Sequence, residues 1–373
     1  IPSANILPIS PTGFSGPELG LSPSLPGLRT LFEQGRCAVV ANVGTLAEPM
    51  TRDQWKAGSK RAPRQLFSHS DQYTIWESGL ADRVSESGWL GRLGDMTANA
   101  FNPSSQLSIT MSIAGTTQIL AGNQTIQYQV SSGGVARVRD VNSLYGSAAG
   151  GAAFKQLFTM AGPNVLQDGL SSITTRALSN AALVETALAA QPALTSVFPN
   201  TDIGNQAKMV ARMIGARKAL QQRRQIFVIA MGGWDMHNSL TEEHLPRLKD
   251  LDAAMSALYA ATAEMGVSSN VTQFTVSEFG RCLQHNGRGS DHGWGSHHFV
   301  VGGAVQGRRV FGNWPTVALN TAEDAGNGAL VPTTSLDEYA ATLARWFGAS
   351  PTQLGTVMPN LSRFANPNLG FLA

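Results

Sequence analysis

Two apolar runs in the second half of the chain predict strands joined by a helix. Residues 225–231 are almost entirely apolar and are stopped by Gly232 and Gly233, a pattern typical of a strand buried on both faces. Apolar side chains then recur at helical spacing over residues 245–265, and residues 271–276 form a second strand-like run. Strand, helix and strand in this order predict a parallel sheet with helices on both faces.

The first half of the chain adds a helix, a strand and a polar insertion. Residues 25–35 have the pattern of a helix closed by glycine, and residues 37–44 that of a buried strand. Residues 102–153 are dense in Gly, Ser, Thr, Asn and Gln with short alternating pieces, which indicates a small β-rich inserted cap. Residues 151–222 are mostly helical in pattern, and 336–347 form the last helix. We therefore expect one α/β domain spanning residues 1–373.

Composition and charge exclude several classes of protein. Of the 373 residues 42% are hydrophobic, which is enough for a sizeable core, and the net charge is only +2. The most basic stretch, residues 221–224, fits a solvated helix end better than a nucleic-acid patch. No apolar run approaches the roughly 18 residues of a membrane span. Cys37 and Cys282 are expected to be two separate buried thiols, with a single disulfide as the alternative.

The chemistry-bearing residues gather in two loops that follow the predicted strands. Six of the seven histidines lie between His237 and His298. The first loop carries Asp235 and His237, and the second carries Asp291 and His292. Carboxylate and neutral imidazole form a mixed oxygen and nitrogen ligand set that suits zinc, manganese or iron, and suits calcium less well. Because ligands bind beyond the carboxyl ends of parallel strands, a metal centre is preferred over unrelated surface residues.

Other histidines are weaker candidates. His297 and His298 are neighbours, and neighbouring side chains in extended chain point to opposite sides, so at most one belongs to the centre. His298 is the preferred one. His244 and His285 are expected to be ordinary solvated or packed side chains.

Three further residues have both a functional and a structural interpretation. Glu278 and Arg281 follow a strand directly, where they would orient a ligand and bind an anionic oxygen, or else form an ion pair that holds the loop. His69 lies at a loop-to-helix junction and either faces the site or only begins the helix. Cys282 is expected to be a packing residue. The sequence contains neither a Gly-X-Ser-X-Gly elbow nor a Walker loop, which excludes the hydrolases and nucleotide-binding proteins that depend on them.

Several motifs together resemble one bacterial family. They are Ser277–Arg281, Ser290–Gly295 and Gly302–Val305, with supporting matches at 41–45, 66–72, 332–335 and 339–348. On these residues the chain is similar to the family catalogued as domain of unknown function 1501 (DUF1501). The resemblance extends from about Leu7 to the C-terminus and is weakest over residues 102–200.

The resemblance implies a fold, a site and a cellular location. DUF1501 proteins are placed with the alkaline phosphatase and sulfatase superfamily, which implies a three-layer α/β/α sandwich with a mostly parallel central sheet. The implied metal ligands are Asp235, His237, Asp291, His292 and a final histidine, His298 or His297. The implied cofactor is a divalent metal, zinc first, with manganese, iron or calcium as alternatives. Family members are typically exported, often through a twin-arginine signal, so a periplasmic, secreted or cell-surface location is implied.

One part of the family pattern is not found in this sequence. The apolar strand that ends in Gly-Gly-Asn-Asp, and the Ser or Thr nucleophile of the wider superfamily that follows it, have no match. A sheet without that strand would expose two unpaired edges, so the strand is expected to be supplied, either by a preceding segment outside this sequence or by a separate N-terminal peptide. Two functions remain: an exported metal-dependent hydrolase of small or polymeric phosphate or sulfate esters, and an exported binding or structural protein that kept the fold without the chemistry.

Overall fold

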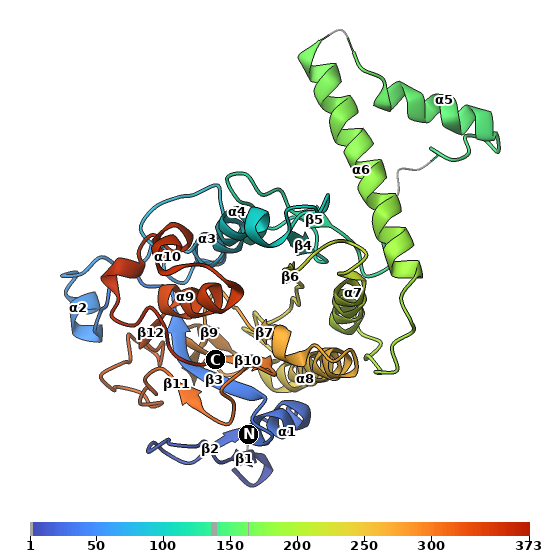
Figure 1. The fold of residues 1–373 in the computed structure, drawn as a ribbon. Coiled ribbons are helices and arrows are strands. Elements are labelled where there is room, and N and C mark those ends of the chain that lie inside the picture. Colours follow the sequence, from blue (N-terminus) through green and yellow to red (C-terminus); the bar gives the residue numbers. More distant parts are fainter. Residues whose placement is uncertain (1–2, 136–139, 163) are drawn as a thin grey trace.

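The largest sheet is built around one long, fully buried strand. The computed structural model describes residues 3–135, 140–162 and 164–373. At the centre lies β3 (Cys37–Gly44), whose eight residues are all buried. It pairs antiparallel with β10 (Ser296–Gly302) and parallel with the short strands β11 (Val310–Phe311) and β12 (Thr334–Ser335). On its far side β10 pairs antiparallel with β7 (Thr272–Phe274), as Figure 1 shows.

A second sheet contains the apolar run that follows residue 225. Its middle strand, β4 (Thr110–Ser112), pairs in parallel with β5 (Tyr128–Gln129) and with β6 (Ile226–Val228). Two antiparallel pairs complete the strands: β1 (Leu7–Ile9) with β2 (Leu19–Leu21), and β8 (Arg281–His285) with β9 (Ser290–His292).

These sheets confirm the coarser part of the predicted fold, a mixed α/β architecture. The fold is mixed α/β, but its sheets are small, and the described residues do not show a three-layer sandwich with a mostly parallel central sheet. The reason lies between β7 and β10, where the chain forms only the β8–β9 hairpin and no helix. Parallel strands need a long crossover connection, so β10 returns antiparallel to β7.

Helices cover both sides of the strands. One core packs α4 and α9 with α10, a second packs α7 against α8, and a third holds α1 against α8 and β3. The helices of the main body are α1 (Pro26–Glu33), α2 (Arg52–Lys56), α3 (His69–Ser78), α4 (Trp89–Phe101), α7 (Asp202–Ala216), α8 (Leu240–Glu264), α9 (Leu336–Phe347) and α10 (Pro351–Val357).

The segment predicted as a β-rich cap is divided between two parts of the structure. Strands β4 and β5 pair within the sheet of β6 and so belong to the body. Residues 136–139 of the segment lie outside the described residues. The part that projects is instead a helical hairpin of α5 (Ala148–Thr159) and α6 (Val165–Ala189), shown in green at the upper right of Figure 1. No helix in the described parts of the chain has the length and apolar character needed to span a membrane.

The two cysteines are free and buried, as the sequence predicts. Burial raises the pKa of the Cys37 thiol far above its usual value, and burial followed by the charge of Asp291 raises the pKa of Cys282 to about 11. Since the thiolate is the reactive form, both thiols should react very slowly with a disulfide reagent in the native protein. Ellman's reagent is expected to titrate both thiols in denaturant and neither promptly without it. Prompt reaction of a thiol in the folded protein would contradict this packing.

Candidate metal centre

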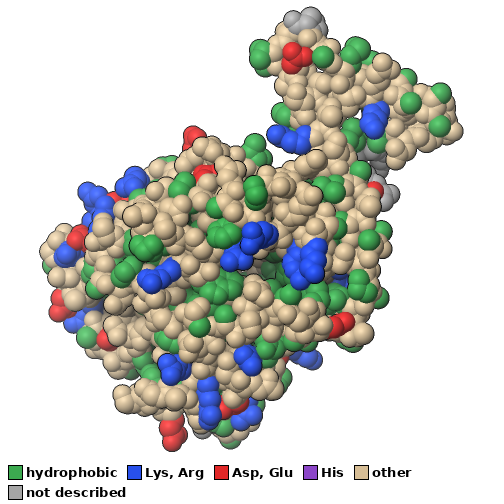
Figure 2. Space-filling model, in the orientation of Figure 1, with side chains coloured by type: hydrophobic (Ala, Val, Ile, Leu, Met, Phe, Trp, Pro, Cys, Tyr) green, Lys and Arg blue, Asp and Glu red, His purple; other side chains and the backbone are tan. Residues whose placement is uncertain are grey.

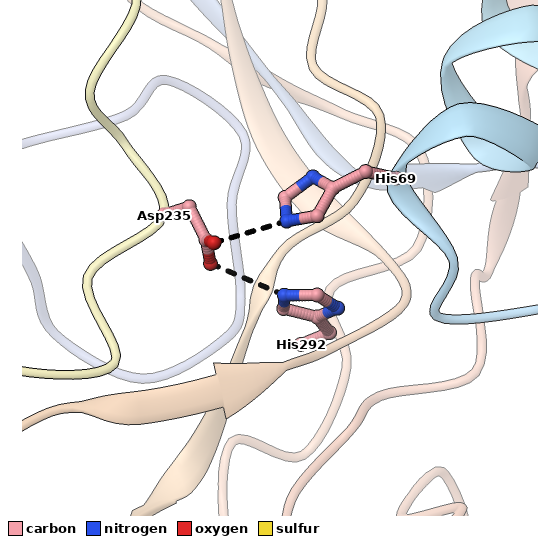
Figure 3. A group of neighbouring side chains, drawn as sticks. All are labelled: His69, Asp235 and His292. Atoms are coloured by element: carbon pink, nitrogen blue, oxygen red, sulfur yellow. Dashed lines mark hydrogen bonds and ion pairs between the residues drawn. The ribbon is translucent and has the colours of Figure 1, made fainter.

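Three loops from distant parts of the sequence meet at the ends of β6 and β7. His69 is the first residue of α3, and Asp235 with His237 lies in the loop between β6 and α8. Glu278 follows β7, and the β8–β9 hairpin supplies the remaining residues. Figure 3 shows His69, Asp235 and His292 pointing toward one another from these separate elements.

Backbone contacts hold the hairpin against the Asp235 loop. The Ser290 N–H donates to the Met236 carbonyl at 3.2 Å, and the Leu240 N–H donates to the Arg288 carbonyl at 3.2 Å. A Cβ at Gly289 would lie 2.3 Å from the backbone of His237, so only glycine allows this approach. The two predicted loops therefore converge because their backbones pack directly on each other.

Asp235 is the centre of the cluster. Its Oδ1 lies 3.0 Å from His237 Nε2 and 3.1 Å from His292 Nε2, and these two nitrogens are 2.9 Å apart. Its Oδ2 lies 3.1 Å from His69 Nε2. The ligand atoms of His69, Asp235 and His292 all lie within 4.8 Å of one another, as a shared ion requires. His237 joins them through its contacts with Asp235 and His292.

Each imidazole is oriented through its other ring nitrogen. Nδ1 of His292 lies 2.6 Å from the carbonyl oxygen of Phe67, which can only accept, so Nδ1 carries the proton. Nδ1 of His237 lies 3.1 Å from Asp291 Oδ1, and Nδ1 of His69 lies 3.0 Å from Glu278 Oε1. An Nδ1–H that donates to an oxygen leaves the Nε2 lone pair free, which is the usual arrangement of metal-bound histidines.

The converging nitrogens lack other partners. His69 Nε2 is buried and has no hydrogen bond, because its contact with Asp235 Oδ2 is close but poorly aligned. With Nδ1 protonated on His237 and His292, two lone pairs face each other at 2.9 Å and need a proton or a cation between them. A tetrahedral zinc ion with bonds of about 2.0–2.1 Å separates its ligand atoms by roughly 3.3 Å. The observed spacings of 2.9–3.1 Å are close to that value, so the donor set fits such an ion.

Arg281 supplies the positive charge beside the cluster. Its Nη1 donates to Asp235 Oδ1 at 2.7 Å, and its Nη2 donates to the Ser290 carbonyl. Burial disfavours the ionised carboxylate of Asp235, but the hydrogen bond from Arg281 and the neighbouring imidazoles outweigh it and hold its pKa at about 2. The side chain of Asp235 is still 43% exposed, so the centre is open to a ligand from solvent.

The structure changes the role expected for Asp291. It was predicted as a metal ligand, but it lies 3.1 Å from Nδ1 of His237, on the side of the ring away from Nε2. Glu278 takes the equivalent position on His69, which agrees with its interpretation as an orienting acid. His69, Asp235, His237 and His292 are the residues that converge.

His298 is not brought into the cluster. Its Nδ1 lies 3.0 Å from the Thr275 hydroxyl and its Nε2 lies 3.0 Å from the Ser296 hydroxyl, so both nitrogens have other partners. Burial lowers its pKa to about 3, which keeps the ring neutral inside the core. His297 accepts from the Asn42 N–H at 3.1 Å and stacks on Trp314. Both residues are structural parts of β10.

The remaining candidates lie beside the centre. His244 packs edge-on to Trp234, and burial lowers its pKa. His285 is exposed and accepts a hydrogen bond from the Gly287 N–H at 3.1 Å. The thiol of Cys282 donates to the His292 carbonyl at 3.0 Å, which fits its expected packing role.

Sequence reasoning missed two groups that orient the ligands. Asn286 donates to the His237 carbonyl at 3.1 Å and to Asp291 Oδ1 at 3.3 Å, joining the two loops. Asn286 and Gly287 form an Asn-Gly pair, which could have indicated a hairpin turn. Phe67 has a φ of 73°, in the left-handed region, and its carbonyl accepts from His292. No signal in the sequence marks this carbonyl.

The fold and the site thus define a mixed α/β protein in which His69, His237 and His292 gather around the carboxylate of Asp235, beyond the ends of β6 and β7. The family model described as "Protein of unknown function (DUF1501)" matches residues 26–345, and the chain belongs to this family. No curated protein matches the chain.

Removing an orienting acid should weaken metal binding without abolishing it. In Asp291→Asn and Glu278→Gln the carboxylate that fixes one imidazole becomes a neutral amide. Each variant is expected to bind zinc about 10–100-fold more weakly, the usual cost of losing such a partner. Titration against a chromophoric chelator measures the change. Unaltered zinc affinity in both variants would contradict the assigned orienting roles.

Proposed function

We propose that this protein is an exported, metal-dependent hydrolase of phosphate or sulfate esters, related to the alkaline phosphatase and sulfatase superfamily. The three-layer α/β/α arrangement, the periplasmic or cell-surface location and zinc as the resident metal belong to this proposal. Its support is the family membership together with the chemistry of the cluster.

One observation carries the proposal. Nε2 atoms of three histidines surround the carboxylate of Asp235, and each ring has its Nδ1 beside an oxygen acceptor. An exposed cluster of this kind favours a catalytic centre, because purely structural zinc sites are closed to solvent. The residues that would hold the ion are His69, Asp235, His237 and His292.

Arg281 gives the site a preference for anions. The Arg281 side chain is 21% exposed, and its guanidinium lies on the Asp235 carboxylate. Planar guanidinium groups match the paired oxygens of phosphate and sulfate. A bound divalent ion would polarise an ester oxygen, and Arg281 would hold a second oxygen of the same group. Two positive charges side by side thus select an anionic ester over a neutral one.

The test combines metal content with turnover. Purified protein loaded with zinc or manganese should hydrolyse p-nitrophenyl phosphate or p-nitrophenyl sulfate, lose the activity on chelation and regain it on metal addition. His292→Ala should lose both metal and turnover. His285→Ala is the matched control, because this exposed histidine lies on the same hairpin, bonds only within its own turn and should leave both unchanged. Stable metal binding without turnover of either ester would refute the hydrolase and leave a binding protein.

A further inference from the structure

The loop that carries Asp235 has a second arginine packed against it. The guanidinium of Arg247, on α8, lies directly over Gly233, where an added Cβ would be 2.3 Å from the guanidinium carbon. One turn earlier on the same face of α8, His244 packs edge-on to Trp234. The loop therefore runs along α8, and Arg247 contacts it two residues before the central carboxylate of the cluster.

The guanidinium of Arg247 has no acceptor in the described parts of the chain. The side chain is half-buried, its Nε is buried without a hydrogen-bond partner, and no ion pair or hydrogen bond among those residues involves it. Glu243 and Asp250 are spaced to pair with it along the helix, yet the guanidinium turns onto Gly233 instead. Since a guanidinium has five N–H donors, leaving them unpaired in a partly buried position is costly. Its donors are available to an acceptor that approaches the loop.

The acids of the metal centre do not compensate Arg247. Asp235 accepts from Arg281 at 2.7 Å, and Glu278 and Asp291 each lie on Nδ1 of an imidazole. The positive charge of Arg247 is therefore not paired with any carboxylate of the centre. A ligand that carries its own negative charge would satisfy both the charge and the unpaired donors.

The guanidinium lies close enough to the cluster to hold a second part of a bound molecule. Two residues of extended chain span at most about 7 Å, so the Cα atoms of Gly233 and Asp235 are no farther apart than that. Gly232 and Gly233 are exposed, and a Cβ added at Gly232 would meet nothing within 4 Å. This stretch of the loop is therefore open to solvent right beside the cluster.

The direction in which the centre opens is consistent with this position. Figure 2 shows no histidine side chain on the face it presents, although the side chains of His69 and His237 are each 42% exposed. The centre therefore opens on a side turned away from that view, and a second group of a bound ester must be held on that side. Arg247 meets this requirement, because it packs on the loop that carries Asp235.

We propose that Arg247 forms a second anion subsite of the metal centre, so that the preferred substrate is an ester with a further anionic group beside the one that is cleaved. This inference deepens the proposed hydrolase function and rests on it. The cleaved phosphate or sulfate would lie on the ion and Arg281, and the second carboxylate, phosphate or sulfate on Arg247. A planar guanidinium binds the paired oxygens of each of these groups. Sugars and polymers that carry several charged groups have this chemistry, and simple monoesters lack it.

The test uses the zinc-loaded protein and aryl phosphonates, which resemble phosphate esters but are not hydrolysed. The compound para-carboxyphenylphosphonate has a second charge, and para-carbamoylphenylphosphonate is its neutral isostere. Calorimetry should show that the carboxylate binds at least about 10-fold more tightly, the gain expected from a hydrogen-bonded charge pair. Arg247→Gln should abolish this preference and leave the affinity for the neutral compound unchanged. The meta isomers vary the spacing, and the para-sulfonate and para-bisphosphonate identify which second group is preferred.

The control variants separate the subsite from the metal centre. Lys249→Gln removes an exposed cation from the same helix, two residues away and so on another face, and should keep the preference. Arg247→Lys keeps the charge and should retain part of it. Zinc affinity should be the same in all of these variants, because Arg247 is bonded to none of the proposed ligands.

Two results would overturn the subsite. One is equal binding of charged and neutral phosphonates by the unaltered protein in both the para and the meta series. The other is a preference for the charged compound that persists in folded Arg247→Gln. A preference that depends on Arg247, in a protein that hydrolyses no ester, would support the subsite and refute the hydrolase alone.

Discussion

Replacing Asp235 with asparagine is expected to reduce the affinity for zinc or manganese by more than about 100-fold, a larger loss than an orienting residue gives. The substitution keeps the shape of the side chain but removes the one charge on which three imidazoles converge. It also leaves the Arg281 guanidinium without its 2.7 Å carboxylate partner. Two like charges, the ion and Arg281, would then lie together without compensation. Competition with a chromophoric chelator, at fixed ionic strength, gives the affinity.

The matched control for this change is Asp53→Asn. Asp53 is 80% exposed and its carboxylate pairs with Arg52, which tests the loss of a similar ion pair outside the cluster. This variant should bind the ion as the parent protein does. Circular dichroism confirms that each variant is folded. Wild-type affinity in folded Asp235→Asn would show that the carboxylate is no ligand.

The second large effect is on folding stability, and it comes from a buried acid that is not part of the metal centre. Asp337, in the first turn of α9, is 3% exposed, and its Oδ1 has no hydrogen-bond partner. Burial raises the pKa of this carboxyl to about 8. The folded protein therefore keeps a proton that the unfolded chain releases near its ordinary value of 3.8, so stability is greatest below that pH. As the pH rises further, the free energy of unfolding falls by at most about 1.4 kcal/mol per pH unit, until the pH passes the pKa of Asp337 in the folded protein.

The substitution Asp337→Asn should remove this loss of stability at high pH. The amide has the size of the protonated acid and no charge to bury, so a gain of about 2–4 kcal/mol in unfolding free energy is expected at pH 8.5. The gain should shrink steadily toward pH 5. Urea unfolding at both pH values measures it, with Asp53→Asn as the exposed control. A pH-independent difference, or a destabilised variant at pH 8.5, would contradict the buried-acid account.

Local patterns in the sequence were sufficient for the strands and for the two loops of the site. The buried strand at residues 37–44 and the apolar run after residue 225 are both strands in the structure. Asp235, His237 and His292 converge because the loop after β6 and the β8–β9 hairpin pack directly on each other. His69 was an open alternative, and the structure brings it to Asp235 from the start of α3.

Non-local packing explains what the sequence did not reveal. Asp291 and His292 are neighbours, and their side chains point to opposite sides of β9, so only His292 faces Asp235 while Asp291 reaches the back of His237. The sequence favours His298 as a metal ligand but does not show that β10 pairs with β3. That pairing buries the His298 ring in the core. The antiparallel course of β10 depends on the hairpin before it, and periodicity carries no information on strand direction.

The most direct test of the central claim is a crystal structure of the zinc-loaded protein with diffraction recorded on both sides of the zinc absorption edge. We predict one anomalous peak about 2.0–2.1 Å from Nε2 of His69, His237 and His292, with an oxygen of Asp235 completing the shell. Zinc present in the crystal but located elsewhere, with the four side chains still in mutual contact, would contradict the claim.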